Sequence, residues 1–364
     1  MTQSTADTAT LSRDRRREIL QERLEQVVAA GAAGVQFRIA DGEDVFTARV
    51  GEAEAGSGTP VPYDGRFRAA CITKVFVSTV VLQLRAEGKV DLDQPIETYL
   101  PGVLPEGGRI KVRHMLQHTS GLYNHADSFQ RPGVRFLRDR YKHYEPEDLV
   151  AVAAGKPLNF EPGTQFEYSN TNYIALGMLI KKVTGRDYAT EITERIIKQL
   201  GLTGTYVPDT DDPEIHGPHA HGYMQIKGRS EDVTLMNPSE ASSAGSIIST
   251  AEDLDRFLVA LVSGELLAEP EFADMIDRVP SEWVPLPMSA GYGLGFMPLE
   301  TSCGLSLWGH GGGIPGYATF IGSTLDGRKR VITSITLDID PDDFSGRFEN
   351  TVVAAIEAAT ECLL

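Results

Sequence analysis

The chain has 364 residues, of which 41% are hydrophobic and 23% are charged, and its formal net charge at pH 7 is −17. This composition is that of a globular protein and excludes the fibrous and disordered classes. The negative charge opposes binding to nucleic acid and to anionic membrane surfaces, so we expect neither as a partner.

The three cysteines, Cys71, Cys303 and Cys362, form neither a disulfide framework nor a metal-ligand spacing. Such usage is typical of reduced thiols in a reducing compartment. The arginines between positions 13 and 17 are not followed by an apolar run, so no secretory signal is visible. No stretch reaches the roughly 18 apolar residues of a membrane span. We therefore expect a cytoplasmic protein.

The predicted elements begin with a helix, because apolar residues recur at helical spacing over 8–30. Two strands joined at the Asp41-Gly42 turn follow, over 34–40 and 44–50. The middle of the chain is mostly helical, with predicted helices over 72–87, 112–118, 147–154, 171–183, 188–200 and 251–262. Three more strands, over 306–308, 317–325 and 330–337, precede a closing helix over 348–363.

Strands from both ends of the chain and helices from its middle indicate an α+β fold. We expect an antiparallel sheet of five or more strands with flanking helices, and an inserted, mainly helical region. Residues 1–66 and 290–364 would form the sheet lobe and 67–289 the mainly helical lobe. The active site would lie between the two lobes.

Three short segments carry candidate chemistry. In the first, Cys71-Ile-Thr-Lys74, a thiol and an ammonium lie one turn apart on the same face of a helix start. Both the helix N-terminus and the ammonium favour a thiolate, so the pKa of Cys71 should be lower than that of a free thiol.

The second segment, Tyr168-Ser-Asn170, offers a phenol and an amide just before a helix. The third surrounds His310, and its glycines allow close approach to a ligand and present backbone N–H groups. Taken singly, these segments are more often a buried cysteine, a helix cap and a hairpin turn. Their joint order favours an active site.

These segments resemble the serine β-lactamase-like family, which includes class C β-lactamases, D-specific peptidases, esterases and acyltransferases. The family's Ser-x-x-Lys motif is matched by Cys71-Ile-Thr-Lys74 and its Tyr-x-Asn motif by Tyr168-Ser-Asn170. Its Lys-Thr-Gly or His-x-Gly motif is matched by His310-Gly311-Gly312. Flanking signatures over 110–122, 244–253 and 292–296 match as well, and the resemblance extends from about residue 34 to the C-terminus.

The resemblance implies a role for each matched residue. Cys71 would attack a carbonyl and hold the acyl group, while Lys74 and Tyr168 would share general-base and general-acid duty. Asn170 would hold Lys74 or a substrate amide, and His310 would shape the electrostatics of the site. The backbone N–H groups of Cys71 and Gly313 would form the oxyanion hole.

Substrate contacts are expected from Tyr123, Gly311 and Gly312. Tyr123 begins an aromatic and basic segment, 123–144, that is either a roof over the site or a solvated helix and loop. No cofactor and no metal are implied, because the histidines at 216, 219 and 221 fall in a predicted exposed loop without further ligands.

The departure from the family is a cysteine where it has serine, and three interpretations stay open: a natural thiol enzyme, a Ser→Cys substitution, or a site that binds without turnover. A thioester intermediate reacts far more readily with amines than with water, which favours acyl transfer. We predict an acyl-enzyme hydrolase or acyltransferase for a small ester, amide or thioester, with water or an amine as acceptor.

Two further interpretations are weighed. One is a non-catalytic, acyl-binding or penicillin-binding relative. The other, a true β-lactamase or D-peptidase, is disfavoured, because its substrates lie outside the membrane and no export signal is visible. The oligomeric state is left open.

Overall fold

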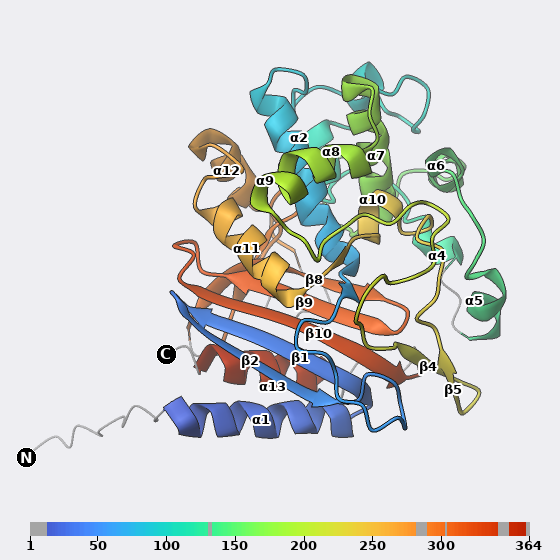
Figure 1. Cartoon of the computed structure of the whole chain (residues 1–364). Helices are drawn as coiled ribbons and strands as arrows, with labels where there is room; N and C mark the ends of the chain where they lie inside the picture. The colour runs from blue at the N-terminus through green and yellow to red at the C-terminus, as the bar shows by residue number, and fades with distance from the viewer. Residues whose placement is uncertain (1–12, 130–132, 282–289, 303, 341–348, 362–364) are drawn as a thin grey trace, which may run out of the picture.

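The computed structural model describes residues 13–129, 133–281, 290–302, 304–340 and 349–361. The predicted α+β fold is confirmed: a mainly antiparallel sheet carries helices on both faces (Figure 1). Cys303 and Cys362 lie outside the described residues, as do the outer ends of the predicted first and last helices.

The sheet is built from both ends of the chain, in the order β2-β1-β10-β9-β8-β7. These strands are β1 (Ala32–Asp41), β2 (Asp44–Gly51), β7 (Met297–Glu300), β8 (Ser306–Ile314), β9 (Tyr317–Ser323) and β10 (Lys329–Ile339). The first strand pairs antiparallel with the last, with Val35 opposite Ile335. The two ends of the chain therefore hold each other in place.

Two further strands come from the middle of the chain. β4 (Tyr223–Ile226) pairs in parallel with the end of β10 and antiparallel with β5 (Arg229–Asp232). Within the described residues the sheet thus has eight strands. β4 and β5 fall in the range 67–289 that we expected to be mainly helical, and they extend the sheet at the end of β10.

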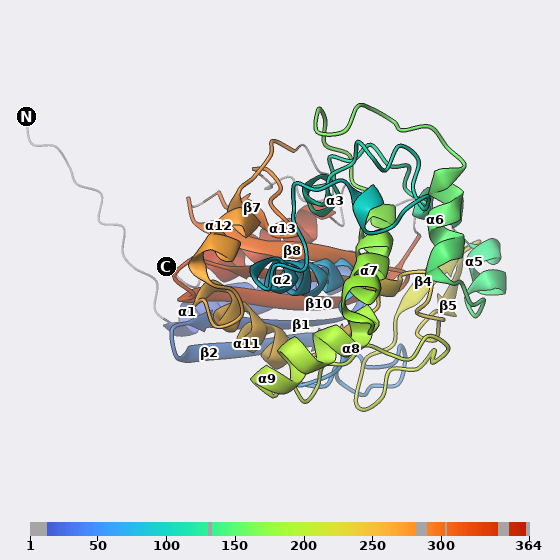
Figure 2. The same cartoon turned by 90° about the horizontal axis from the view of Figure 1, so that it is seen from above.

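Helices cover the two faces of the sheet differently, as Figures 1 and 2 show. On one face lie α1 (Arg13–Ala29) and α13 (Glu349–Glu361), which contact each other. Leu20, Leu24 and Val27 of α1 are fully buried there in one cluster with Val35 of β1. The other face receives α11 (Ala251–Val262) and the helical region. α11 begins at Ala251, as predicted. The Thr250 side chain caps it by accepting a hydrogen bond from the Asp253 N–H.

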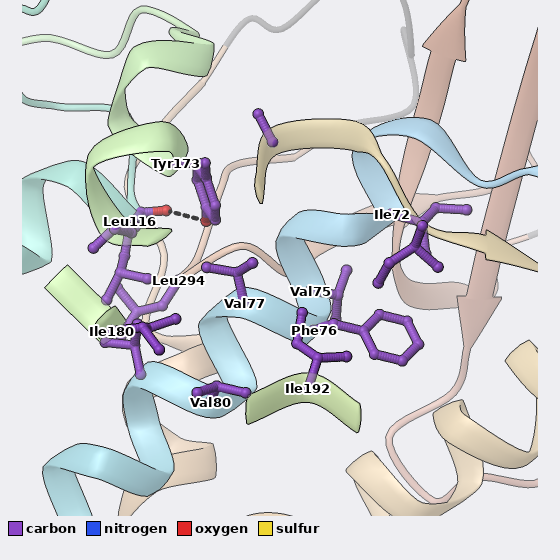
Figure 3. Close-up of a cluster of buried hydrophobic side chains, with 14 of the residues drawn as sticks. Ile72, Val75, Phe76, Val77, Val80, Leu116, Tyr173, Ile180, Ile192 and Leu294 are labelled. Carbon is purple, nitrogen blue, oxygen red and sulfur yellow. Dashed lines mark hydrogen bonds between the residues drawn. The ribbon is translucent and has the colours of Figure 1, made fainter. Parts of the chain in front are cut away.

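The centre of the helical region is α2 (Thr73–Ala86), which is buried along almost its whole length. Its apolar residues lie on all sides, with Lys74, Ser78 and Thr79 buried among them, as expected for a helix surrounded by other elements. Figure 3 shows Val77 and Val80 of α2 packed with Leu116, Ile180 and other apolar side chains. The Tyr173 hydroxyl in this cluster donates to the Leu116 carbonyl, 2.9 Å away.

The remaining elements of this region are one long helix, α7 (Asn170–Thr184), and a series of shorter elements. The shorter ones are β3 (Phe67–Arg68), η1 (Ala70–Ile72), η2 (Ile96–Thr98), α3 (Val112–Leu116), α4 (Ala126–Phe129), α5 (Val134–Asp139), α6 (Pro146–Ala154), α8 (Tyr188–Ile192), η3 (Thr193–Ile197), α9 (Lys198–Leu200), α10 (Ser242–Gly245), β6 (Ile248–Ser249) and α12 (Glu269–Ile276). The single helix predicted over 188–200 is interrupted by a π-helical turn, η3. Across the described parts of the chain, no helix has the length and apolar character needed to cross a membrane.

Candidate active site

Cys71 lies in the 3₁₀ turn η1, directly before α2. The preceding residue, Ala70, has φ = 50°, a left-handed conformation that is uncommon for a residue with a side chain. The turn is held from two sides: the Ala69 N–H donates to the Ile247 carbonyl at 2.8 Å, and the Thr319 hydroxyl donates to the Ala69 carbonyl at 3.0 Å. Neighbouring contacts thus fix the backbone that carries the thiol.

Lys74 is fully buried in the first turn of α2. Its ammonium donates to Oδ1 of Asn170 at 2.8 Å and to the Ala244 carbonyl at 2.7 Å. Burial lowers the pKa of Lys74, and the negative charge and hydrogen bond of Cys71 oppose that shift. The pKa of Lys74 therefore lies below its ordinary value, and the neighbouring Cys71 limits the shift.

Several polar groups act on the pKa of Cys71. Burial alone would raise its pKa, but the Lys74 charge and hydrogen bonds from Tyr168, the Gly313 N–H and Lys74 outweigh it. The net result is a pKa below the ordinary value of 9.0, in the direction expected from the motif. These groups together favour the thiolate, which is the nucleophilic form.

Tyr168 approaches from the segment before α7. Burial, and then the charge of Cys71, raise its pKa well above the ordinary value. The phenol therefore stays protonated and can give its proton to a group that becomes more basic. Its ring lies 4.9 Å from the Lys74 ammonium, measured to the ring centroid.

His118 supports the Tyr168–Asn170 segment, a role that sequence reasoning missed. Its Nδ1 accepts from the Ser169 N–H at 3.2 Å and from the Asn172 side chain at 3.1 Å. The His118 ring also packs on that of Tyr168, with centroids 4.1 Å apart. Since both neighbours donate, Nδ1 carries no proton, and burial keeps the imidazole neutral by lowering its pKa.

His310 is fully buried on β8. Its Nδ1 bonds to the Gly311 carbonyl, which can only accept, so Nδ1 carries the proton. Nε2 then accepts from the Tyr292 hydroxyl at 2.9 Å. Burial, and then the Lys74 charge, lower the pKa of His310 to about 3. His310 is therefore neutral and does not add a second positive charge near Lys74.

The glycines of β8 differ in what surrounds them. A Cβ on Gly312 would lie 2.4 Å from Thr319 Oγ1 and 2.6 Å from the Ala69 carbonyl, whereas a Cβ on Gly313 would meet nothing within 4 Å. Gly312 is thus needed for close packing against the turn that carries Cys71. The Gly313 N–H, which points at the Cys71 sulfur, is free of that constraint.

A cavity of about 500 Å³ opens beside Cys71, with Asn170 and Gly313 also in its lining. Its walls are largely apolar and include Phe129, Phe136, Met224, Met236 and Ile314. Its charged lining residues are Arg140 and Glu240. A small molecule with an apolar side chain fits such a lining.

The predicted site residues are distributed unequally around this cavity. Lys74, Tyr168 and Asn170 meet at Cys71. Tyr123, Gly311 and Gly312, our expected substrate contacts, are not among the lining residues, and the Tyr123 hydroxyl lies 3.2 Å from that of Ser128. The segment that Tyr123 begins does form one wall, through Ala126, Phe129, Phe136 and Arg140.

The three histidines weighed as metal ligands each have another partner. His216 contacts the Asp212 carboxylate at 2.5 Å, His219 contacts the Gly217 carbonyl at 2.7 Å, and His221 contacts the Asp232 carboxylate at 2.7 Å. Within the described ranges, no group of three or more His, Cys, Asp or Glu side chains is arranged to hold a metal ion.

Comparisons with known proteins identify enzymes to which this chain is similar. The sequence model of the family described as "Beta-lactamase" matches residues 18–356. The solved structure of a D-stereospecific amidohydrolase from Streptomyces sp. is similar with a TM-score of 0.83 and 38% identity, covering 93% of this chain and 98% of that one. A D-amino acid amidase from Ochrobactrum anthropi SV3, complexed with L-phenylalanine amide, gives a TM-score of 0.84 and 27% identity over 96% of this chain and 98% of that one.

Two curated relatives are similar over shorter stretches. Putative penicillin-binding protein PbpX of Bacillus subtilis is 28% identical over 223 residues, which are 61% of this chain and 51% of that protein. Esterase EstB of Burkholderia gladioli is 29% identical over 182 residues, which are 47% of this chain and 45% of that protein. The chain thus spans about half the length of these two relatives.

Proposed function

The chain belongs to the beta-lactamase family, and we propose that it is an acyl-enzyme hydrolase or acyltransferase in which Cys71 stands at the position of the family's catalytic serine. One observation carries this proposal: the Lys74 charge, the Tyr168 hydroxyl and the Gly313 N–H all act on the Cys71 thiol and together lower its pKa against the effect of burial, while Lys74 is held in place by Asn170. A structural cysteine in an apolar core has no need of three polar donors.

In the first step, the Cys71 thiolate attacks the carbonyl carbon of the substrate. A C–S bond forms and the carbonyl π electrons move to oxygen. The backbone N–H groups of Cys71 and Gly313 donate to this oxyanion. One such donor contributes about 10²–10³ in rate in comparable sites.

In the second step, the tetrahedral intermediate collapses and the bond to the leaving nitrogen or oxygen breaks. Tyr168 gives its proton to the leaving group, and the phenolate that remains is stabilised by the Lys74 ammonium 4.9 Å from its ring centroid. The acyl group is now held on Cys71 as a thioester.

In the third step, water or an amine attacks the thioester carbon. The Tyr168–Lys74 pair takes the proton of the attacking group, the C–S bond breaks, and the thiolate is restored. Because amines attack thioesters more readily than water does, acyl transfer competes well with hydrolysis whenever an amine is present.

We propose small amides and esters as donors, and amides of amino acids as the first to test. The two similar solved structures are amidohydrolases of D-configured substrates by name, and the curated relatives include an esterase. The largely apolar cavity beside Cys71 suits a donor with an apolar side chain.

The decisive experiment is the intact mass of the protein after mixing with p-nitrophenyl acetate, with and without an added amine. We expect an acetyl adduct that is absent in Cys71→Ala and disappears faster when the amine is present. A thermal melt of Cys71→Ala matching that of the wild type shows that the control is folded. An adduct that persists in water and amine alike supports a binding relative, and no adduct with ester, amide or thioester donors overturns the proposal.

A further inference from the structure

Glu240 is a half-buried carboxylate in the lining of the cavity that holds Cys71. Among the residues that the structure describes, none donates a hydrogen bond to this carboxylate or forms an ion pair with it. A carboxylate removed from water without a partner is unfavourable, because burial penalises its charged form. Within the described part of the chain, the Glu240 carboxylate in the candidate substrate cavity therefore lacks a hydrogen-bond donor or a cation to balance its charge.

The backbone around Glu240 is rigidly held. The Asn237 N–H donates to the Arg140 carbonyl at 2.7 Å, and the Tyr144 N–H donates to the Ser239 hydroxyl at 2.9 Å. The backbone of Glu240 itself bonds the imidazole of His125. Because this backbone is fixed, the Glu240 carboxylate cannot move far to adapt to a ligand that fits poorly, so it can discriminate between ligands.

The same segment leads directly to the catalytic lysine. Four residues after Glu240, the Ala244 carbonyl accepts a hydrogen bond from the Lys74 ammonium at 2.7 Å. Ala241, Ala244 and Gly245 line the cavity together with Glu240 and Cys71. An acyl donor bound in this cavity with its carbonyl at Cys71 therefore shares the cavity with Glu240.

The local charges call for a cation at this carboxylate. Burial, and then the charge of Asp139, raise the pKa of Glu240, and no positively charged group opposes them. Arg140 lines the same cavity, but its Nη1 donates to the Asp232 carbonyl at 2.6 Å and its guanidinium lies 4.9 Å from the Tyr141 ring centroid. The carboxylate is therefore not neutralised from within the cavity.

We propose that Glu240 binds a positively charged group of the acyl donor and selects donors that combine a free ammonium group with an apolar side chain. This inference rests on the function proposed above. The substrate class is then amides and esters of amino acids whose amino group is unmodified. The apolar walls, among them Phe129 and Met236, receive the side chain, and Glu240 receives the ammonium.

The test compares two donors that differ only in the ammonium: phenylalanine p-nitroanilide, as both enantiomers, and 3-phenylpropionic acid p-nitroanilide. We expect the wild type to favour the amino donor in kcat/KM by at least about tenfold, the usual weight of a hydrogen bond to a charged partner. In Glu240→Gln, which keeps the shape of the side chain, this ratio should fall to within about threefold of one. Glu240→Asp, which keeps the charge, should recover part of it.

The matched control is Asp127→Asn, an exposed carboxylate that follows Ala126 of the cavity wall in sequence and already accepts from the Asn124 side chain at 2.8 Å. The preference should survive this change, and its loss in Asp127→Asn but not in Glu240→Gln would overturn the assignment. A third donor, N-succinyl-phenylalanine p-nitroanilide, carries a carboxylate in place of the ammonium, and a wild-type preference for it would overturn the assignment in favour of Arg140. If neither these donors nor p-nitrophenyl acetate acylates wild-type Cys71, the proposed function itself fails. If p-nitrophenyl acetate acylates Cys71 but these donors do not, or if the ratio is unchanged in Glu240→Gln, only this inference is removed.

Discussion

The ammonium nitrogen of Lys74 lies 2.8 Å from Oδ1 of Asn170, although the two residues are 96 positions apart in the chain. The contact joins the first turn of α2 to the first turn of α7, so two helices fix the position of one charge. That charge lies against the Cys71 sulfur and lowers the pKa of the thiol. Variants that remove the charge should therefore alter both the protonation and the reactivity of Cys71.

Replacing Lys74 by methionine should lower kcat/KM by about 10²-fold or more, because the acid–base partner of Tyr168 is lost. The pH midpoint of Cys71 alkylation should rise, since the Lys74 charge and its hydrogen bond lower the pKa of Cys71 below 9.0 in the wild type. Activity assays measure kcat/KM, and the rates of iodoacetamide labelling between about pH 5 and 10 give the pH midpoint. Lys182→Met, at an exposed position of α7, is the control, and an unchanged midpoint in Lys74→Met contradicts the assignment.

Cys71→Ser should retain acylation but change the fate of the acyl-enzyme. The intermediate becomes an oxygen ester, which discriminates less strongly in favour of amines than a thioester does. We expect the ratio of aminolysis to hydrolysis products to fall by about tenfold or more. Product analysis by mass spectrometry at a fixed amine concentration measures this ratio, and an equal ratio in both proteins would mean that sulfur does not determine the acceptor.

Gly312→Ala should destabilise the protein by about 1–3 kcal/mol, as overpacking of a tight contact usually does. The new methyl group would lie 2.6 Å from the Ala69 carbonyl, in the turn that carries Cys71, so activity should fall as well. Gly313→Ala is the matched comparison, because a methyl group there meets nothing within 4 Å. Urea unfolding of the two variants measures the difference, and equal losses of stability would contradict the packing argument.

Stability should fall on acidification, partly through His125, which is 1% exposed. Burial lowers its pKa from 6.5 to about 4, so the unfolded chain binds a proton between these values while the native protein does not. Its contribution is complete above pH 6.5 and is lost as the pH falls towards 4, by about 3 kcal/mol in all. Urea unfolding across this range should show a shallower pH dependence in His125→Asn, and a slope identical to that of the wild type would refute the prediction.

Much of the fold could be predicted because its signals are local. The alternation in β1 and β2 around Asp41-Gly42, and the apolar runs of the last strands, indicate a sheet built from both ends of the chain. The interruption within 188–200 could not be seen, because the residues of η3 have ordinary helical spacing. β4 joins β10 through two register pairs only, which leaves little trace in its sequence.

The residues of the candidate site also fall into two groups, those that local spacing identifies and those that it does not. Cys71 and Lys74 share one helical turn, and Tyr168 and Asn170 share one short segment, so their spacing identifies them. His118, Tyr292 and Glu240 reach the site only through packing between distant segments. His118, for example, holds Ser169 from 51 residues away. The glycine-rich motif indicates a close approach, but not that Gly313 rather than Gly311 or Gly312 lines the cavity.

The pairing of β1 with β10 has a consequence for how the protein is made. During synthesis β1, which ends at Asp41, leaves the ribosome long before its partner β10, which begins at Lys329. At ordinary elongation rates this delay is on the order of tens of seconds. Throughout it the β1–β2 hairpin exposes an unpaired edge, which is a target for chaperones and for aggregation. The nascent chain can complete its sheet, and close the cavity around Cys71, only when its last strands have emerged.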